Sequence, residues 1–150
     1  MVTVLAIRHA DIDLPAATED PGLSAAGRAR ADALAHVVGH CPISTIFTSR
    51  LTRTKQTVEP TARLLGLLPR VAPTAATLAR QARAGQLGSL VLVAGHTNTI
   101  PPVLTALGAT SVPVIGEREF DNLFVLTTYP GGAELLQLRY GSTSSPSSEQ

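Results

Sequence analysis

The sequence predicts an α/β fold of three layers, in which helices cover both faces of a mainly parallel central sheet and a β-hairpin follows at the carboxyl end. Two observations predict it. Short apolar, β-prone segments alternate with longer segments whose apolar residues recur at helical spacing, which is typical of parallel sheets. This alternation then gives way to two strand-like segments separated by Pro130-Gly131-Gly132, a hairpin signal. A chain of 150 residues can form one domain with a real core, and we expect that domain over residues 1–140.

The first half of the chain is predicted to form two strand–helix units. The first strand covers Val2 to Ile7, and a loop rich in proline and aspartate follows it. Ser24 is a typical helix cap, and small apolar residues at helical spacing then continue to about Gly39. The second unit has a strand at Ile43 to Thr48 and a helix whose apolar stripe runs from Leu51 to Leu65 and is closed by Gly66.

The second half repeats the pattern once before the hairpin. In order we expect a helix at about Ala75 to Ala84, a strand at Leu90 to Ala94, a helix from about Pro101 with Asn98 as its cap, and hairpin strands at Asn122 to Tyr129 and Ala133 to Tyr140. The last ten residues, 141–150, are mostly Ser, Thr, Pro and Gly and are expected to be a disordered tail.

Composition argues against several classes of partner. Twelve basic residues against eleven acidic ones give a net charge of +1, and the basic residues are scattered, so we expect neither a nucleic acid nor a membrane as partner. Cys41 is the single cysteine, which excludes an internal disulfide and a cysteine-based metal site. With no apolar run near the roughly 18 residues of a membrane span, a cytoplasmic protein is expected. The sequence makes no prediction of an oligomeric state.

Two predicted strands each end in a histidine. Arg8-His9 follows the first strand and His96 follows the strand at Leu90 to Ala94. The carboxyl ends of strands in open α/β sheets border the ligand-binding crevice, so both rings are expected there. Two histidines with several arginines suggest phosphate chemistry. His36 and His40 are four residues apart on one helix, but no third ligand is evident and surface positions are expected for both.

Four segments in order resemble the histidine phosphatase superfamily, also called the phosphoglycerate mutase-like fold, and within it the small branch without a cap domain that includes phosphohistidine phosphatases. Their order and spacing match the family over roughly residues 1–128. They read Arg8-His9-Ala10-Asp11, Leu23-Ser24-Ala25-Ala26-Gly27, Thr48-Ser49-Arg50-Leu51-Thr52-Arg53-Thr54-Lys55-Gln56-Thr57 and Gly95-His96-Thr97-Asn98. Each segment alone is common by chance, whereas the ordered set is specific.

The resemblance implies a phosphatase in which His9 is the nucleophile and becomes a phosphohistidine that water then hydrolyses. It also implies that Arg8, Arg53 and His96 bind the phosphoryl oxygens, where charge builds up during transfer. Ser49 and Thr97 are further candidates for substrate contact, and Arg50 is either a surface residue or a substrate contact. No metal and no cofactor are expected, and the substrate would be a phosphorylated small molecule or a phosphoprotein.

One departure from the family concerns the acid that protonates the leaving group. Members usually carry it after the second helix, yet no carboxylate occurs between Glu59 and Glu117. Asp11, Asp13 or a residue of the segment 117–122, Glu119 foremost, could replace it; the simplest interpretation of that segment is a solvated entry to the hairpin. Otherwise the substrate needs little help, as a phosphoramidate would. A phosphate-binding regulatory module without turnover is the alternative function, and a mutase is less favoured.

Overall fold

The fold is described from a computed structural model, which describes residues 1–144. The elements are β1 (Val2–Arg8), α1 (Ala25–Val38), β2 (Thr45–Thr48), α2 (Thr52–Leu65), β3 (Arg70–Val71), α3 (Ala75–Arg83), β4 (Leu90–Gly95), α4 (Ile100–Ala106), β5 (Asn122–Tyr129) and β6 (Gly132–Arg139). Residues 145–150 of the predicted tail lie outside the described part. Within residues 1–144, no helix combines the length and the apolar character needed to cross a membrane.

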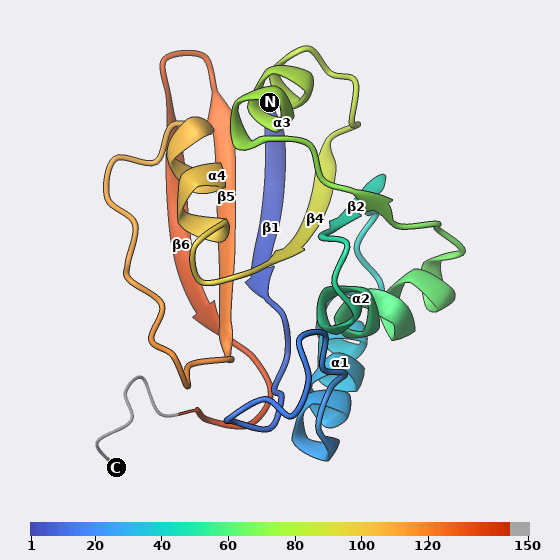
Figure 1. Ribbon diagram of the computed structural model, residues 1–150. Coiled ribbons are helices and arrows are strands. Elements are labelled where there is room, and N and C mark those ends of the chain that lie inside the picture. Colours follow the sequence, from blue (N-terminus) through green and yellow to red (C-terminus); the bar gives the residue numbers. More distant parts are fainter. Residues whose placement is uncertain (145–150) are drawn as a thin grey trace.

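The strands form one sheet in the order β3-β2-β4-β1-β5-β6. β3, β2, β4 and β1 run parallel, whereas β5 pairs with β1 in the antiparallel direction and with β6 as a hairpin (Figure 1). This confirms the predicted α/β class, the mainly parallel sheet and the terminal hairpin. The two-residue strand β3 was not predicted, because both of its residues are exposed and carry no apolar pattern.

Helices cover both faces of the sheet, as predicted. Side chains alternate along β1, so Val4 and Ala6 pack with α3 and α4, while Leu5 and Ile7 pack with α1 and α2. Leu34 and Leu104 are fully buried on the two opposite faces. Because both faces are covered, β1 and β4 are nearly continuous apolar runs, and polar side chains can appear only where these strands end.

Local signals place the helix ends close to their predicted positions. The hydroxyl of Ser24 accepts a hydrogen bond from the N–H of Gly27, and Gly66 ends α2 in the left-handed conformation at φ 70°. The predicted cap of α4 was wrong: the cap position belongs to Thr99, and Asn98 lies in the preceding turn. The hydroxyl of Thr99 instead accepts a hydrogen bond from the N–H of His96 at 2.8 Å, which fixes the end of β4.

Candidate active site

The carboxyl ends of β1, β4 and β2 place His9, His96 and Ser49 side by side. The N–H of His9 donates to the carbonyl of Gly95 at 2.8 Å, so the pairing of β1 with β4 continues to the first histidine. The two imidazole rings lie with their centroids 5.4 Å apart. The two histidines that the sequence places at strand ends are therefore close neighbours in space.

His9 is held as a neutral imidazole in one tautomer. Its Nδ1 donates to the carbonyl of Ala10 at 2.7 Å, which leaves Nε2 with a free lone pair. The N–H of Ala10 is bonded in turn to the hydroxyl of Thr57, at 2.8 Å, and this ties the strand end to α2. The pKa of His9 is lowered to about 3, chiefly by burial and also by the nearby Arg8, His96 and Arg53, against the opposing effect of the Ala10 carbonyl.

His96 is likewise neutral and is bonded to the loop after β2. Its Nε2 lies 2.9 Å from the hydroxyl of Ser49, which is itself 2.8 Å from the hydroxyl of Thr54. Burial lowers the pKa of His96 to about 4, with Arg53 and Arg8 contributing in the same direction. Ser49 thus contacts the second histidine, while Thr97 is half-buried in the turn after it.

Arg8 and Arg53 bring guanidinium groups to the same place. The Nη1 of Arg8 donates to the carbonyls of Glu117 at 2.7 Å and Glu119 at 3.0 Å, and its guanidinium stacks 4.0 Å from the ring centre of Phe120. Burial lowers the pKa of Arg8 to about 10, although Asp11, Glu117 and Glu119 raise it; Arg53 lowers it.

Within residues 1–144, three guanidinium nitrogens at this place are buried without a hydrogen-bond partner. They are the Nε of Arg8 and the Nε and Nη1 of Arg53. An unsatisfied buried donor costs about 1–3 kcal/mol. These positively charged donors lie beside two neutral imidazoles, so the site has a positive potential that suits an oxyanion.

The carboxylates proposed as general acids are bound elsewhere or exposed. Asp11 forms an ion pair with the buried Arg30 at 2.6 Å, and Asp13 is exposed. Glu119 accepts hydrogen bonds from Arg139 at 2.6 Å and from the N–H of Gly116 at 2.9 Å. Burial alone would raise the pKa of Glu119, but these hydrogen bonds outweigh it and the net shift is downward. The lowered pKa makes Glu119 a poor proton donor, and the carboxylate of Asp11 is engaged by Arg30.

The segment 117–122 is the solvated entry that the sequence predicted only at Glu117 and Arg118, which are exposed. Glu119, Phe120, Asp121 and Asn122 are all buried, and Phe120 lies 5.9 Å from the ring of His9. The reason is a partner that is remote in sequence, since Arg139 on β6 neutralises both Glu119 and Asp121. Ser144, in the predicted tail, also donates its N–H to Asp121 at 3.3 Å and accepts from the N–H of Phe120.

Phe120 and Thr57 are the site residues that sequence reasoning missed. Phe120 gave no signal because it stands among charged residues, and only the fold shows that it packs beside His9 and Arg8. Thr57 is part of the motif that follows Thr48, so its position was visible although its bond to Ala10 was not. Gly27 belongs to another motif, and a Cβ at this position would overlap the carbonyl oxygen of Asp11.

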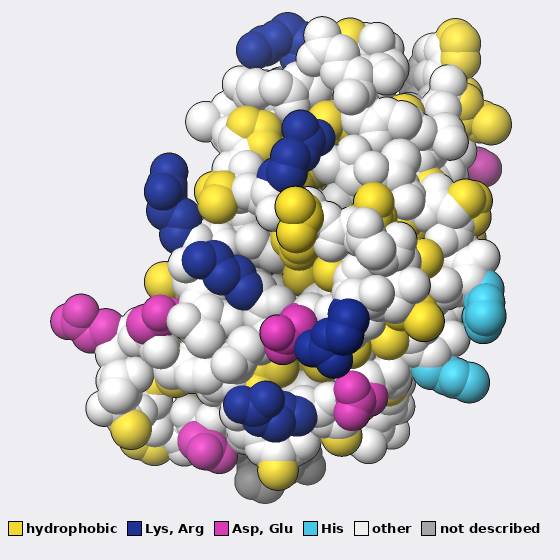
Figure 2. Space-filling model, turned by 90° about the vertical axis from the view of Figure 1, so that its right-hand side faces the viewer, with side chains coloured by type: hydrophobic (Ala, Val, Ile, Leu, Met, Phe, Trp, Pro, Cys, Tyr) yellow, Lys and Arg dark blue, Asp and Glu magenta, His cyan; other side chains and the backbone are white. Residues whose placement is uncertain are grey.

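The remaining arginine and histidine residues considered as substrate or metal contacts lie at the surface. Arg50, His36 and His40 are exposed, which agrees with the surface positions predicted for the two helical histidines. Within residues 1–144, no group of three or more His, Cys, Asp or Glu side chains could hold a metal ion. On the face drawn in Figure 2, Lys and Arg side chains are interspersed with hydrophobic and acidic ones.

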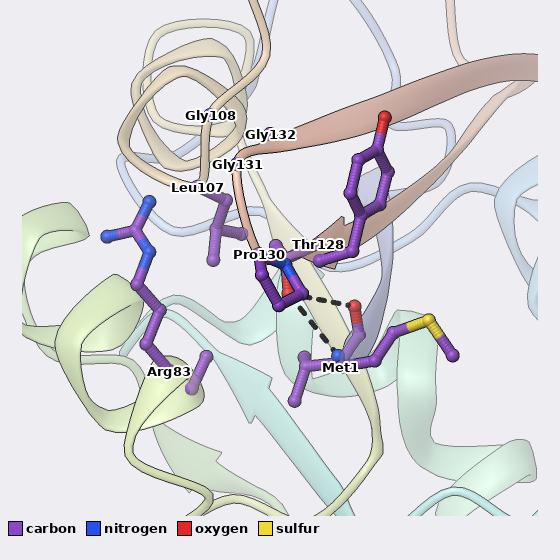
Figure 3. A pocket seen from close by; sticks show the side chains of 11 residues that line it. Met1, Arg83, Leu107, Gly108, Thr128, Pro130, Gly131 and Gly132 are labelled. Carbon is purple, nitrogen blue, oxygen red and sulfur yellow. Dashed lines mark hydrogen bonds between the residues drawn. The ribbon is translucent and has the colours of Figure 1, made fainter.

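A separate cavity of about 370 Å³ lies at the opposite end of the sheet, where β1 begins and the hairpin turns (Figure 3). Met1, Arg83, Gly108 and the turn at 130–132 line it, with the hydroxyl of Thr128 bonded to the backbone of Val2. Its lining contains no histidine and no carboxylate. The candidate active site is therefore at the carboxyl ends of the strands.

Comparison with known proteins agrees with this geometry. Residues 4–74 match the model of the histidine phosphatase superfamily (branch 1). Over this stretch, just under half of the chain, the sequence is similar to the histidine phosphatase superfamily. The matched region includes β1 with His9 and the start of α2 with Arg53, so it contains three of the four residues that the resemblance assigns to catalysis.

Solved structures share the histidine phosphatase fold over nearly the whole chain. A protein assigned as the phosphohistidine phosphatase SixA from Agrobacterium tumefaciens is 21% identical, with a TM-score of 0.65, and the match covers 94% of this chain and 98% of that one. A mycobacterial glucosyl-3-phosphoglycerate phosphatase is 16% identical, with a TM-score of 0.65 and coverage of 95% and 99%.

A sequence relative is much longer than this chain. The PE-PGRS family protein PE_PGRS11 from Mycobacterium tuberculosis is 34% identical over 108 residues, which are 70% of this chain and 18% of that protein. This chain therefore spans less than a fifth of the relative that it matches.

Proposed function

We propose that this chain is a phosphatase that hydrolyses a phosphomonoester or a phosphoramidate through a covalent phosphohistidine on His9. One observation carries the proposal: three buried guanidinium nitrogens of Arg8 and Arg53 have no partner among the described residues and lie near the two neutral histidines. A phosphoryl group supplies the acceptors that these donors lack, and its negative charge offsets the two guanidinium charges.

In the first step, the lone pair of His9 Nε2 attacks phosphorus. The new N–P bond forms as the bond from phosphorus to the leaving group breaks, and the electron pair departs with the leaving group. Arg8, Arg53 and His96 hold the three equatorial oxygens, where charge accumulates in the transition state. The carbonyl of Ala10 holds the Nδ1 proton and stabilises the imidazole ring as it gains positive charge.

In the second step, water attacks the phosphohistidine. Its oxygen forms a bond to phosphorus, the P–N bond breaks, and the electron pair returns to Nε2 while the water proton passes to phosphate or solvent. The arginines supply the positive charge that a metal supplies in other phosphatases, so we propose a metal-independent reaction without a cofactor.

The contacts of the carboxylates favour a leaving group that departs with little protonation. Asp11 is paired with Arg30, and Glu119 is paired with Arg139. A positioned acid contributes about 10²–10⁴-fold in rate for a poor leaving group. Phosphoramidates such as phosphohistidine, or acyl phosphates, need this help least. The fold shared with a protein assigned as a phosphohistidine phosphatase supports the same substrate class.

The same paired carboxylates also favour a second candidate, a phosphate-binding regulatory module that has kept the anion pocket without turnover. The two functions differ in one step, the formation of the N–P bond. A binder would hold inorganic phosphate at Arg8 and Arg53 and never carry it covalently on His9.

The test is phosphoryl trapping with labelled phosphoramidate, followed by hydrolysis of an aryl phosphate. The wild-type protein should retain acid-labile, base-stable phosphate and turn over, and His9→Ala should do neither. His36→Ala, which changes an exposed histidine, is the matched control and should behave as the wild type. Turnover by a folded His9→Ala variant would refute the proposal, and phosphate binding without trapping in the wild type would favour the regulatory module.

A further inference from the structure

A cavity of about 310 Å³ lies beside His96, on the side away from His9. The order of the strands sets this arrangement, because β1, β4, β2 and β3 follow one another in the sheet. Their carboxyl ends therefore present His9, then His96, then Ser49, and finally the loop that begins at Ala72. His96 and Ser49 form one wall of the cavity, and Ala72 to Ala75 form another.

The lining of this cavity is apolar and carries no full charge. Ala94, Ile100 and Val103 line it together with Ala72 and Pro73, and its polar side chains belong to Ser, Thr, Asn and His residues. No Asp, Glu, Lys or Arg side chain contributes to it. His96 is uncharged near neutral pH because its pKa is about 4. An ionised group that entered this space would lose hydration without meeting a counter-charge.

In-line transfer directs the leaving group toward this space. The attacking nitrogen and the departing atom lie on opposite sides of phosphorus. With His9 on one side of the phosphoryl group, a leaving group that extends along the sheet edge, past His96, would reach the cavity. The volume is at the lower end of the range for small-molecule pockets, which suits a group about the size of one ring.

We infer that the cavity beside His96 is the leaving-group subsite, and that it selects an uncharged, apolar group of about one ring over an anionic one. This inference rests on the proposed phosphatase function and deepens it. The substrate class is then a phosphate ester or phosphoramidate of an uncharged ring. Sugar-acid phosphates, whose leaving groups carry a carboxylate, are excluded from this class.

Two aryl phosphates that are matched in phenol acidity and differ in charge test the subsite. Wild-type kcat/KM should be at least about tenfold higher for 4-chlorophenyl phosphate than for 4-carboxyphenyl phosphate, since the second must bury a carboxylate. Ala75→Arg adds a cation to the lining and should lower that ratio at least about tenfold. Ala76→Arg changes the next residue of α3, which is exposed, and should leave the ratio unchanged.

The outcomes separate this inference from the proposed function. Equal kcat/KM for the two substrates, or the same ratio in both arginine variants, would overturn the subsite while His9-dependent turnover kept the phosphatase. If neither ester is hydrolysed and phosphoramidate leaves no phosphate on His9, the proposed function fails, and a binding measurement then tests the subsite alone. Calorimetry should then show phenylphosphonate binding several-fold tighter than methylphosphonate in the wild type, with the difference abolished in Ala75→Arg; equal binding would overturn the subsite.

Discussion

Replacing Arg53 with methionine should stabilise the protein and abolish its function. Two nitrogens of the Arg53 guanidinium are buried without a protein partner. Each such donor costs about 1–3 kcal/mol, and because the residue is only half-buried we take about 1–3 kcal/mol for the whole group. Methionine keeps an apolar stem of similar length and removes both the donors and the repulsion of Arg8.

The gain should appear as a higher melting temperature in phosphate-free buffer. For a chain of this length, each kcal/mol corresponds to about 2–4 °C, so Arg53→Met should melt about 2–12 °C above the wild type. With phosphate added, the wild type should instead melt at the higher temperature. At a concentration of about 100 Kd it adds about 2.7 kcal/mol to the wild type, whereas a variant that no longer binds phosphate gains nothing. Turnover should fall on the order of 10²–10³-fold.

Arg50→Met is the control, because Arg50 is exposed and lies three residues before Arg53. It should change neither the melting temperature nor the response to phosphate. The reasoning fails if Arg53→Met lowers the free energy of unfolding in phosphate-free buffer while Arg50→Met does not. That result would mean that the Arg53 guanidinium makes stabilising hydrogen bonds in the protein without phosphate, so its donors are not left free for an anion.

Three further predictions follow from the same contacts. His9 and His96 are uncharged in the folded protein, with pKa values of about 3 and 4, so the unfolded chain takes up protons first as the pH falls below 6.5. Denaturant titrations should show the free energy of unfolding falling by up to about 1.4 kcal/mol per pH unit for each ring between pH 6.5 and 4, and a flat profile would contradict the burial of the rings. Because His9 stays uncharged in the folded protein, kcat/KM should keep its neutral-pH value down to pH 5. A decline in kcat/KM centred near pH 6.5 would show that His9 titrates as a free imidazole. Asp11→Asn should lower the free energy of unfolding by about 3 kcal/mol, since it leaves the buried Arg30 unpaired, and should slow esters of good and poor leaving groups by the same factor; a selective loss on poor leaving groups would identify Asp11 as the acid.

Much of the site was predictable because its residues follow strands whose signal is local. The run from Val2 to Ile7 is apolar enough to be recognised alone, and a charged pair directly after it must lie at the strand end. The cap at Ser24 and the glycine at Gly66 depend on backbone positions within one helical turn. The ordered motifs around His9, Arg53 and His96 then specify a family before any contact is known.

The burial and pairing of the carboxylates could not be predicted from the sequence. Glu119 and Asp121 stand in a polar segment, and nothing nearby in sequence indicates that they are buried. Their charge is balanced by Arg139, which lies 18 residues beyond Asp121 on the hairpin. The role of Asp11 was equally open, since its partner Arg30 lies 19 residues away on α1. An ion pair between distant elements leaves no periodic pattern in the sequence. The sequence therefore indicated Asp11, Asp13 and Glu119 as candidate acids, whereas in the fold Asp11 and Glu119 are paired with arginines.

The sequence by itself determined the fold class, the element order and the strand ends at which the histidines stand, because periodicity and capping are properties of neighbouring residues. The tertiary structure decided which side chains meet. It brought the rings of His9 and His96 to 5.4 Å, left buried nitrogens of Arg8 and Arg53 without protein partners, and opened a cavity beside His96. These features depend on the order of strands in the sheet, and that order is set by packing between residues that are remote along the chain.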